Sequence, residues 1–257
     1  MNEIITFGQG YKLSSGIKTF VKSARSMCNQ VTVISTGLTD DLISFLTDNG
    51  VNLINADELA KTHNVKTNIS PYTLKVIYFY LYVKFYSLNT NVYLSDFTDL
   101  FFQKDPFDLI QNIKPYVTSE NHYMYDCETN KTWINICYNA DVFNLLKKYQ
   151  ILNGGTIFGN RETVIDLLKE MCTDMTHIIS RIGNYQNIDQ ASLNKTVYFD
   201  QHRYNILSGY QIMNLAHFQH AKVEYNDYIT INGKTPHVIH QYDVIKPLEN
   251  YLYVKHQ

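Results

Sequence analysis

The chain carries little net charge of either sign, and this scarcity bears on what it binds. Its 22 lysine and arginine residues face 24 aspartate and glutamate residues, which gives a formal charge of -2 at pH 7 and a pI near 6.5. A nucleic-acid-binding domain normally shows a basic stripe or a strongly basic pI. The sequence therefore predicts no nucleic-acid partner.

Cysteines are few and widely spaced. The four of them form no Cys-x-x-Cys pair, whereas zinc sites and disulfide frameworks need cysteines at characteristic spacings. Neither kind of site is indicated. We expect reduced thiols, as in a cytosol-like compartment, at Cys28, Cys127, Cys137 and Cys172.

Long hydrophobic runs are absent as well. No window approaches the roughly 20 apolar residues that span a bilayer, and the most apolar stretch, residues 74–88, contains Lys75 and Lys84. The first residues already have a strand pattern and leave no room for the charged and apolar regions of a signal peptide. These absences predict a cytoplasmic protein without a transmembrane segment.

Core-forming residues, by contrast, are abundant. The 257 residues are 45% hydrophobic and 14% aromatic, enough for one sizeable α/β domain. Extended and helical patterns alternate through the first hundred residues, which is typical of a mainly parallel central sheet flanked by helices. No repeat or proline-rich linker divides the chain, so we predict a single domain over residues 1–257. The first expected strands are residues 4–7, 31–35, 51–54 and 92–94.

The expected helices come from the same periodicity. Ser70 and Pro71 form a helix start, after which apolar residues recur at helical spacing as far as Leu88. Asn187 is a candidate cap for the last of the other helical patterns, which cover residues 17–27, 42–46, 142–149, 164–171 and 188–194. The second half is less regular, and its predicted strands are residues 123–125, 151–158, 197–199 and 238–240.

An acidic loop follows the fourth predicted strand. In the run NVYLSDFTDLFFQKDPF of residues 91–107, Asp96 and Asp99 end an apolar stretch, and Asp105-Pro106 gives a helix-start signal. The ordinary alternative is a turn in which one aspartate caps a helix and the other faces water. We favour a metal site, because open α/β sheets bind ligands at the carboxyl ends of their strands and hard divalent cations take carboxylate oxygens.

This run resembles the DxD region of GT-A glycosyltransferases, and it is closest to the branch that reads D-x-x-D followed by Q-x-D-P-F. In that family the acids hold Mn²⁺ or Mg²⁺ against the diphosphate of a nucleotide-sugar. The resemblance implies one GT-A, Rossmann-like domain with a nucleotide-binding half over about residues 1–110 and an acceptor-binding half over about residues 111–257. The spacing of three positions instead of two leaves the direct ligand open. We favour Asp99, with Asp96 towards the ribose or a metal-bound water.

Two further motifs match the family in their order along the chain. Asn153-Gly154-Gly155 is similar to the family's N-x-G strand, in which glycines let the backbone approach the donor and the asparagine amide meets sugar hydroxyls. Asp189-Gln190 resembles the start of the D-Q-x-x-x-N helix, whose acid faces the reacting sugar. The ordinary alternatives are a β-bulge for the glycines and a helix-dipole interaction for the aspartate.

A histidine near the carboxyl terminus is a fourth candidate. His240 ends an extended apolar step, and the His-Gln-Tyr-Asp run that begins there looks like the segment that completes the metal shell in glycogenin-like members. An imidazole beside two carboxylates suits Mn²⁺ better than Mg²⁺. A structural, hydrogen-bonded histidine is the alternative.

Two weaker candidates concern the nucleotide. Phe7-Gly8 ends the first predicted strand, where the family seats the base, so Phe7 is expected to stack on uracil. Lys75 occupies a position where relatives often carry a basic residue that touches the nucleotide. An ordinary strand-end glycine and a solvated helix lysine are the alternatives.

Together the resemblance implies a metal-dependent glycosyltransferase that moves a hexose or deoxyhexose from a UDP-sugar to a hydroxyl of a glycan, a protein or a lipid-linked acceptor. Mn²⁺, or Mg²⁺, is the expected cofactor, with Asp96, Asp99 and His240 as ligands. Asp189 is the expected catalytic residue, as a base if configuration inverts or as a group that orients the acceptor if it is retained. A catalytically silent nucleotide-sugar-binding module and, with less support, a sugar nucleotidyltransferase remain as alternatives.

Overall fold

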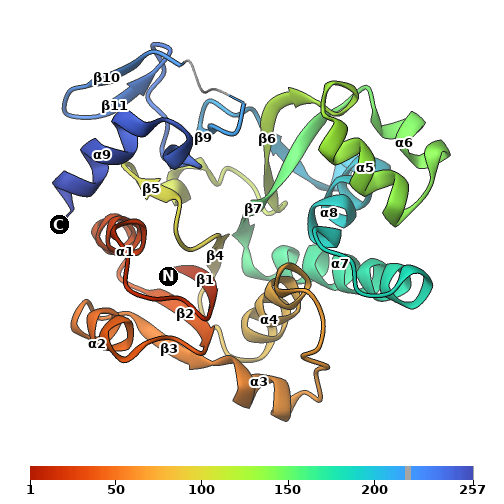
Figure 1. Cartoon of the computed structure of the whole chain (residues 1–257), viewed down its shortest axis with the longest axis horizontal. Coiled ribbons are helices and arrows are strands. Elements are labelled where there is room, and N and C mark those ends of the chain that lie inside the picture. The colour runs from red at the N-terminus through yellow and green to blue at the C-terminus, as the bar shows by residue number, and fades with distance from the viewer. Residues whose placement is uncertain (218–220, 257) are drawn as a thin grey trace.

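A seven-stranded sheet lies at the centre of the computed structural model, which describes residues 1–217 and 221–256 (Figure 1). Its strand order is β3-β2-β1-β4-β7-β6-β8. β7 runs antiparallel to both of its neighbours, and each of the other pairs in the sheet is parallel. The mainly parallel α/β sheet predicted from the sequence is confirmed. Its strands are β1 Asn2–Gln9, β2 Val31–Thr36, β3 Asn52–Asn55, β4 Asn91–Ser95, β6 Tyr116–Tyr123, β7 Gln150–Asn160 and β8 Asn205–Leu207.

Helices cover both faces of this sheet. Successive strand residues point to opposite faces, so Ile4 packs with α1 and α2, whereas Ile5 packs with α3, α4, α7 and α8. None of the helices in the described part of the chain is long and apolar enough to cross a membrane. The helices are α1 Ser15–Met27, α2 Asp40–Asp48, α3 Ala56–Thr62, α4 Pro71–Phe85, α5 Glu128–Cys137, α6 Ala140–Leu146, α7 Arg161–Ile182, α8 Ile188–Phe199 and α9 Lys246–Lys255.

A three-stranded sheet lies beside α1 and α9 (Figure 1). It is formed by β5 (Leu100–Phe102), β12 (Val238–His240) and β9 (Ile212–Asn214). β12 pairs antiparallel with β5, which brings the carboxy-terminal part of the chain back to the acidic loop. The strands β10 (Val223–Tyr225) and β11 (Ile229–Ile231) form a separate antiparallel hairpin.

The strand predicted at residues 197–199 is wrong, because these residues form the last turn of α8. A Val-Tyr-Phe sequence favours a strand locally, since β-branched and aromatic residues suit sheets. In the fold, however, Val197 and Tyr198 are buried together with Leu193 and Asn194 one turn earlier, in the layer that α8 forms with α7 and β7. Tertiary packing therefore overrides local propensity at this helix end.

Other predicted boundaries need smaller corrections. β6 occupies Tyr116–Tyr123, so the strand predicted at residues 123–125 is displaced, and Met124–Asp126 form a 3₁₀ turn. The helix start at Asp105 gives only the 3₁₀ turn Pro106–Leu109, which the unpredicted strand β5 separates from the acidic loop. Pro71 opens α4 as predicted. The residues before α4 and α8, Ser70 and Asn187, form no side-chain capping hydrogen bond.

Candidate functional site

A pocket of about 490 Å³ opens where β1 and β4 end. The two strands are neighbours, yet the chain leaves β1 for β2 on one side and returns to β4 on the other. Connections that diverge in this way leave a crevice at the carboxyl ends of the strands, where ligands of open α/β sheets bind. The pocket therefore lies where the fold favours a binding site. Its walls include Phe7 of β1, Lys75 of α4, Asp96 after β4 and Asp189 of α8.

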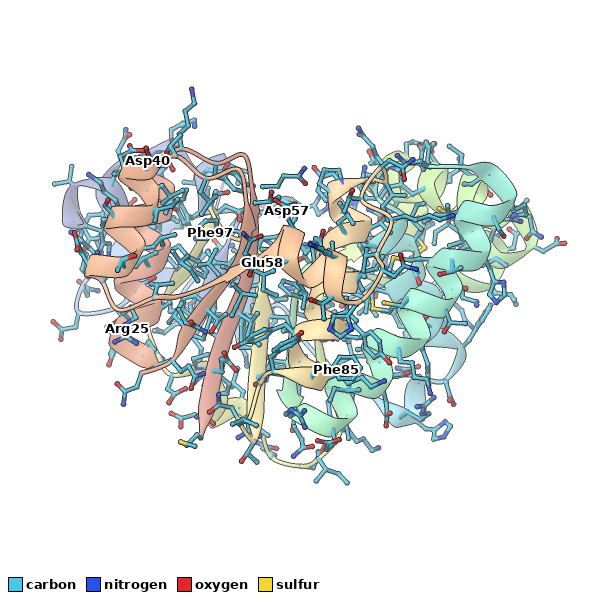
Figure 2. All side chains as sticks on the ribbon, turned by 90° about the horizontal axis from the view of Figure 1, so that it is seen from below. Arg25, Asp40, Asp57, Glu58, Phe85 and Phe97 are labelled. Atoms are coloured by element: carbon cyan, nitrogen blue, oxygen red, sulfur yellow. The ribbon has the colours of Figure 1, made fainter. Side chains whose placement is uncertain are left out.

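The acidic loop is fixed by a buried aromatic ring between the two acids. Phe97 points into the interior (Figure 2), is 2% exposed, and packs edge-on against Phe20 of α1. The backbone N–H of Asp96 donates to the Gly155 carbonyl at 3.1 Å, and the Asp99 carbonyl accepts from the N–H of Gln241 at 2.8 Å. The loop is thus tied to both sheets, which fixes where its carboxylates lie.

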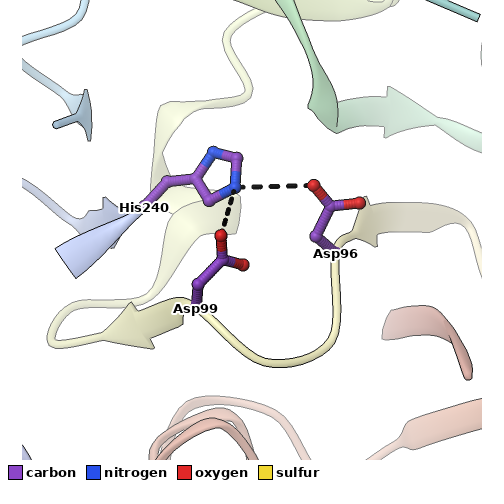
Figure 3. Close-up of side chains that lie close together, drawn as sticks. All are labelled: Asp96, Asp99 and His240. Atoms are coloured by element: carbon purple, nitrogen blue, oxygen red, sulfur yellow. Dashed lines mark ion pairs between the residues drawn. The ribbon is translucent and has the colours of Figure 1, made fainter. Parts of the chain in front are cut away.

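The third member of the cluster comes from the other end of the chain. His240 ends β12, and its Nε2 lies 3.5 Å from Asp96 Oδ2 and 3.5 Å from Asp99 Oδ2 (Figure 3). One ligand atom from each of the three residues falls within 4.8 Å of the others. The pairing of β12 with β5, which places His240 opposite Leu100, produces this convergence.

The donor set fits a divalent cation on two observations. Both ring nitrogens of His240 and Oδ1 of Asp99 are buried without a hydrogen-bond partner among the described residues. Burial by itself would lower the pKa of His240, but Asp99 and Asp96 override it and raise that pKa to about 10. The position therefore favours positive charge, and two carboxylates with an imidazole are ligands that Mn²⁺ accepts.

Gly155 closes the space behind the cluster. A Cβ atom at this position would lie 2.3 Å from Asp96 Oδ2 and 2.6 Å from His240 Cε1. The neighbouring Gly154 is less constrained, because its Cβ would lie 3.4 Å from Asp189 Oδ2. A β-bulge alone therefore does not explain Gly155. A side chain at this position would occupy the space of the Asp96 and His240 side chains.

Lys75 connects the cluster with Asp189. Its Nζ lies 2.8 Å from Asp96 Oδ1 and 3.5 Å from Asp189 Oδ2, and the lysine side chain is 8% exposed. Burial would lower the pKa of Lys75, but the two carboxylates hold it above its usual value. Partial burial by itself would raise the pKa of Asp96. The positive charge of Lys75 and the contact with His240 outweigh this effect and hold the pKa of Asp96 well below its ordinary range. The solvated lysine considered from the sequence is not observed.

Asn153 and Gln190 line the same pocket, but their amides are engaged within the protein. Asn153 Oδ1 accepts from the Gly155 N–H at 2.7 Å, and Gln190 Oε1 accepts from the Gly154 N–H at 3.2 Å. Asn153 Nδ2 donates to the buried carboxylate of Glu120 at 2.9 Å. The amides thus hold the backbone of β7 in place.

Aromatic side chains line the pocket near β1. Phe7 lies there with Tyr11 and Tyr72, whereas Gly8 lies beneath Phe97, whose ring would be 3.0 Å from a Cβ atom at that glycine. Of Phe7 and Gly8, the two residues predicted to contact the base, Phe7 borders the pocket directly. Sequence reasoning missed Tyr11, Tyr72, Trp133 and Glu120. The sequence has 21 tyrosines and only one tryptophan, and no local pattern distinguishes the few that reach the pocket.

Comparison of the sequence with protein-family models gave no match. A search of curated proteins gave none either. The residues and their geometry therefore carry the functional argument.

Proposed function

We propose that this chain is a metal-dependent glycosyltransferase that moves a hexose or deoxyhexose from a nucleoside diphosphate sugar, with UDP as the favoured nucleotide, to a hydroxyl acceptor. The observation that carries the proposal is the convergence of Asp96, Asp99 and His240 beside the crevice at the carboxyl ends of β1 and β4. Two of these residues belong to the motif that resembles the GT-A family, and the third comes from the segment that the resemblance singled out.

In the proposed mechanism Asp96, Asp99 and His240 hold Mn²⁺, or Mg²⁺ as the second choice. When bound, the cation supplies a Lewis acid that neutralises the departing diphosphate. Lys75 adds a second positive charge beside Asp96. The protein's own contribution is to hold these charges in fixed positions before the substrate arrives.

The two ends of the pocket suit different parts of the donor and acceptor. Phe7, Tyr11 and Tyr72 offer aromatic faces on which a base can stack, which supports assigning about residues 1–110 to the nucleotide. Asp189 lies on the other side of Lys75, and burial raises the pKa of Asp189 despite the opposing effect of that lysine. A carboxyl group with a raised pKa suits proton exchange with an acceptor hydroxyl, or orients that hydroxyl if configuration is retained.

The proposed compartment is the cytoplasm, and the proposed acceptor is a glycan, a protein or a lipid carrier reached there. The four cysteines support a reducing environment, because all of them are free thiols.

Calorimetric titration with UDP, in the presence and absence of Mn²⁺, tests the proposal. We expect UDP binding that requires Mn²⁺, and slow Mn²⁺-dependent hydrolysis of one member of a panel of UDP-sugars. Asp99→Asn should weaken Mn²⁺ binding by about tenfold or more, since even the loss of a residue behind a metal ligand costs about 10–100-fold. Asp108→Asn, which alters an exposed acid of the following 3₁₀ turn, is the matched control.

The outcomes separate the alternatives. Mn²⁺-dependent UDP binding without turnover of any donor would identify a binding module instead of an enzyme. UDP binding that ignores Mn²⁺, or unchanged Mn²⁺ affinity in Asp99→Asn, would overturn the proposed metal site.

A further inference from the structure

Glu120 is a buried acid behind the pocket wall. It lies on β6, and its side chain is 6% exposed. Among the residues that the structure describes, no lysine or arginine forms an ion pair with its carboxylate. Its partners are instead Asn153 Nδ2 at 2.9 Å, Gln190 Nε2 at 3.5 Å and His217 Nε2 at 3.2 Å. A carboxylate in the interior needs such donors, because an unpaired buried charge is costly.

These contacts fix which way two pocket amides face. A carboxylate only accepts hydrogen bonds, so the NH₂ groups of Asn153 and Gln190 must turn towards Glu120 and their oxygens away from it. Those oxygens accept the N–H groups of Gly155 and Gly154, respectively. Asn130 Oδ1 supports the same orientation by accepting from Gln190 Nε2 at 3.0 Å. Glu120 therefore orients the amide that bonds Gly155 and, together with Asn130, the amide that bonds Gly154.

The glycine segment in turn supports the acidic cluster. The Gly155 carbonyl accepts from the N–H of Asp96, and the missing Gly155 side chain leaves room for His240. On its other oxygen Glu120 contacts His217, whose ring stacks on that of His122 at 4.0 Å. His217 follows β9, which pairs with the strand that carries His240. Glu120 thus belongs to the central sheet and contacts, through His217, the segment that follows β9 of the three-stranded sheet.

We propose that Glu120 is a positioning residue: by accepting from Asn153 and Gln190 it holds the Gly154–Gly155 backbone against the Asp96–His240 cluster. The effect of Glu120 on the order of the glycine backbone does not depend on which reaction the protein catalyses. The effect of Glu120 on turnover rests on the proposed function.

Hydrogen exchange of the Gly154 and Gly155 amides, measured by NMR on the full chain, tests this role. Glu120→Met keeps the length of the side chain but removes the acceptor, so exchange at both glycines should rise roughly fivefold or more, the factor expected for one net hydrogen bond. Glu120→Gln keeps an oxygen for Asn153 and Gln190, and exchange should stay within about twofold of the wild type. Exchange at Val33, in the core of β2, corrects for changes in global stability.

Glu3→Gln is the matched control, because Glu3 is a second buried acid of the same sheet, on β1, with no bond to this segment. It should leave exchange at both glycines unchanged relative to Val33. Unchanged glycine exchange in Glu120→Met would overturn the proposal, as would an equal rise in Glu120→Gln.

Turnover supplies a second readout. In Glu120→Met the rate constant for hydrolysis of a UDP-sugar and the Mn²⁺-dependent affinity for UDP should both fall, because the glycine segment that Glu120 holds supports the Asp96–His240 cluster. If Glu120→Met shows faster glycine exchange but the wild-type protein binds no UDP, the positioning role stands and the proposed function fails. If UDP binds and glycine exchange does not respond, the positioning role alone fails.

Discussion

Lys75 carries its charge into the interior between two carboxylates. Its ammonium group contacts Asp96 and Asp189, so the site contains a fixed cation even without a metal. Taking three charged groups out of water is costly, and their mutual attraction offsets that cost only while all three remain. The functional reading of Lys75 from the sequence, a contact with the nucleotide, stays a prediction. Its burial gives it in addition a role in stability.

Lys75→Met should therefore destabilise the metal-free protein by about 3 kcal/mol, because it leaves the buried Asp189 carboxylate without its positively charged partner. For a chain of this size the melting temperature should fall by about 6–12 °C, measured by circular dichroism. Added Mn²⁺ should raise the melting temperature of the variant more than that of the wild type, since the metal no longer competes with the lysine for Asp96. Lys84→Met, at an exposed position of the same helix, should cost less than about 0.5 kcal/mol. Equal melting temperatures for the two variants would contradict this account.

The candidate site could be predicted at the level of residues where chemistry and chain order agree. Asp96, Asp99 and His240 were expected to meet, and they do. Glu120 could not be predicted, because a single acid in a strand carries no local signal. Its importance comes from Asn153 and Gln190, which reach it from β7 and α8.

At the scale of elements, β7 shows how a strand can be shaped by the site it supports. It pairs with β4 along Asn91–Ser95, and its Asn153-Gly154-Gly155 segment continues beyond that pairing towards the pocket. Glycine lowers strand stability, since it has no side chain to pack and loses more conformational freedom on folding. The close approach of Asp96 and His240 gives the physical reason why Gly155 is nevertheless present.

Gly155→Ala should consequently displace the acidic cluster while the sheet remains folded. The added methyl group cannot fit 2.3 Å from Asp96 Oδ2 without a shift of that carboxylate. We expect Mn²⁺ affinity, measured by calorimetry, to fall by about tenfold or more, as for other disturbances of ligand geometry. Gly154→Ala meets its nearest atom at 3.4 Å and should retain Mn²⁺ binding. The explanation fails if the two alanine variants bind Mn²⁺ equally well.

The elements were predictable where a pattern was long and periodic. The early strands and the start of α4 follow the expected residues, because burial on one face imposes a period that can be read locally. α4 ends at Phe85, before the predicted end at Leu88, which is exposed. The end of α8 and the boundaries of β6 were not predicted correctly. At the end of α8, residues 197–199 have strand-like composition, but packing against α7 and β7 keeps them helical. Short apolar runs do not by themselves distinguish a helix from a strand.

At the scale of the whole molecule, a buried acid on β1 is joined to three other parts of the chain. Glu3 is fully buried, and its carboxylate accepts hydrogen bonds from β2, from α4 and from the segment that leads into β4. These bonds tie the central strands β1 and β2 to α4, the helix that precedes β4 and the acidic loop. The donors are Gln30, Thr32, Tyr82, Ser87 and Asn89.

Glu3→Ala should lower the free energy of unfolding by about 3 kcal/mol or more, because several buried donors lose their acceptor at once. Urea denaturation measures this change, and the slope of the transition should stay the same. Glu58→Ala, which removes an acid at the surface of α3 (Figure 2), serves as the control and should stay within about 0.5 kcal/mol of the wild type. A loss below about 1 kcal/mol for Glu3→Ala would show that water replaces its hydrogen bonds.

The sequence by itself determined the α/β class, the mainly parallel sheet and the loop that carries Asp96 and Asp99, because periodicity, proline placement and the end of an apolar run are local properties. Only the tertiary structure decided that β12 lies beside β5 and brings His240 to that loop, that Lys75 is buried, and that Glu120 orients two amides. These contacts join residues that are far apart in the chain. They depend on how sheets and helices pack, which no single segment encodes.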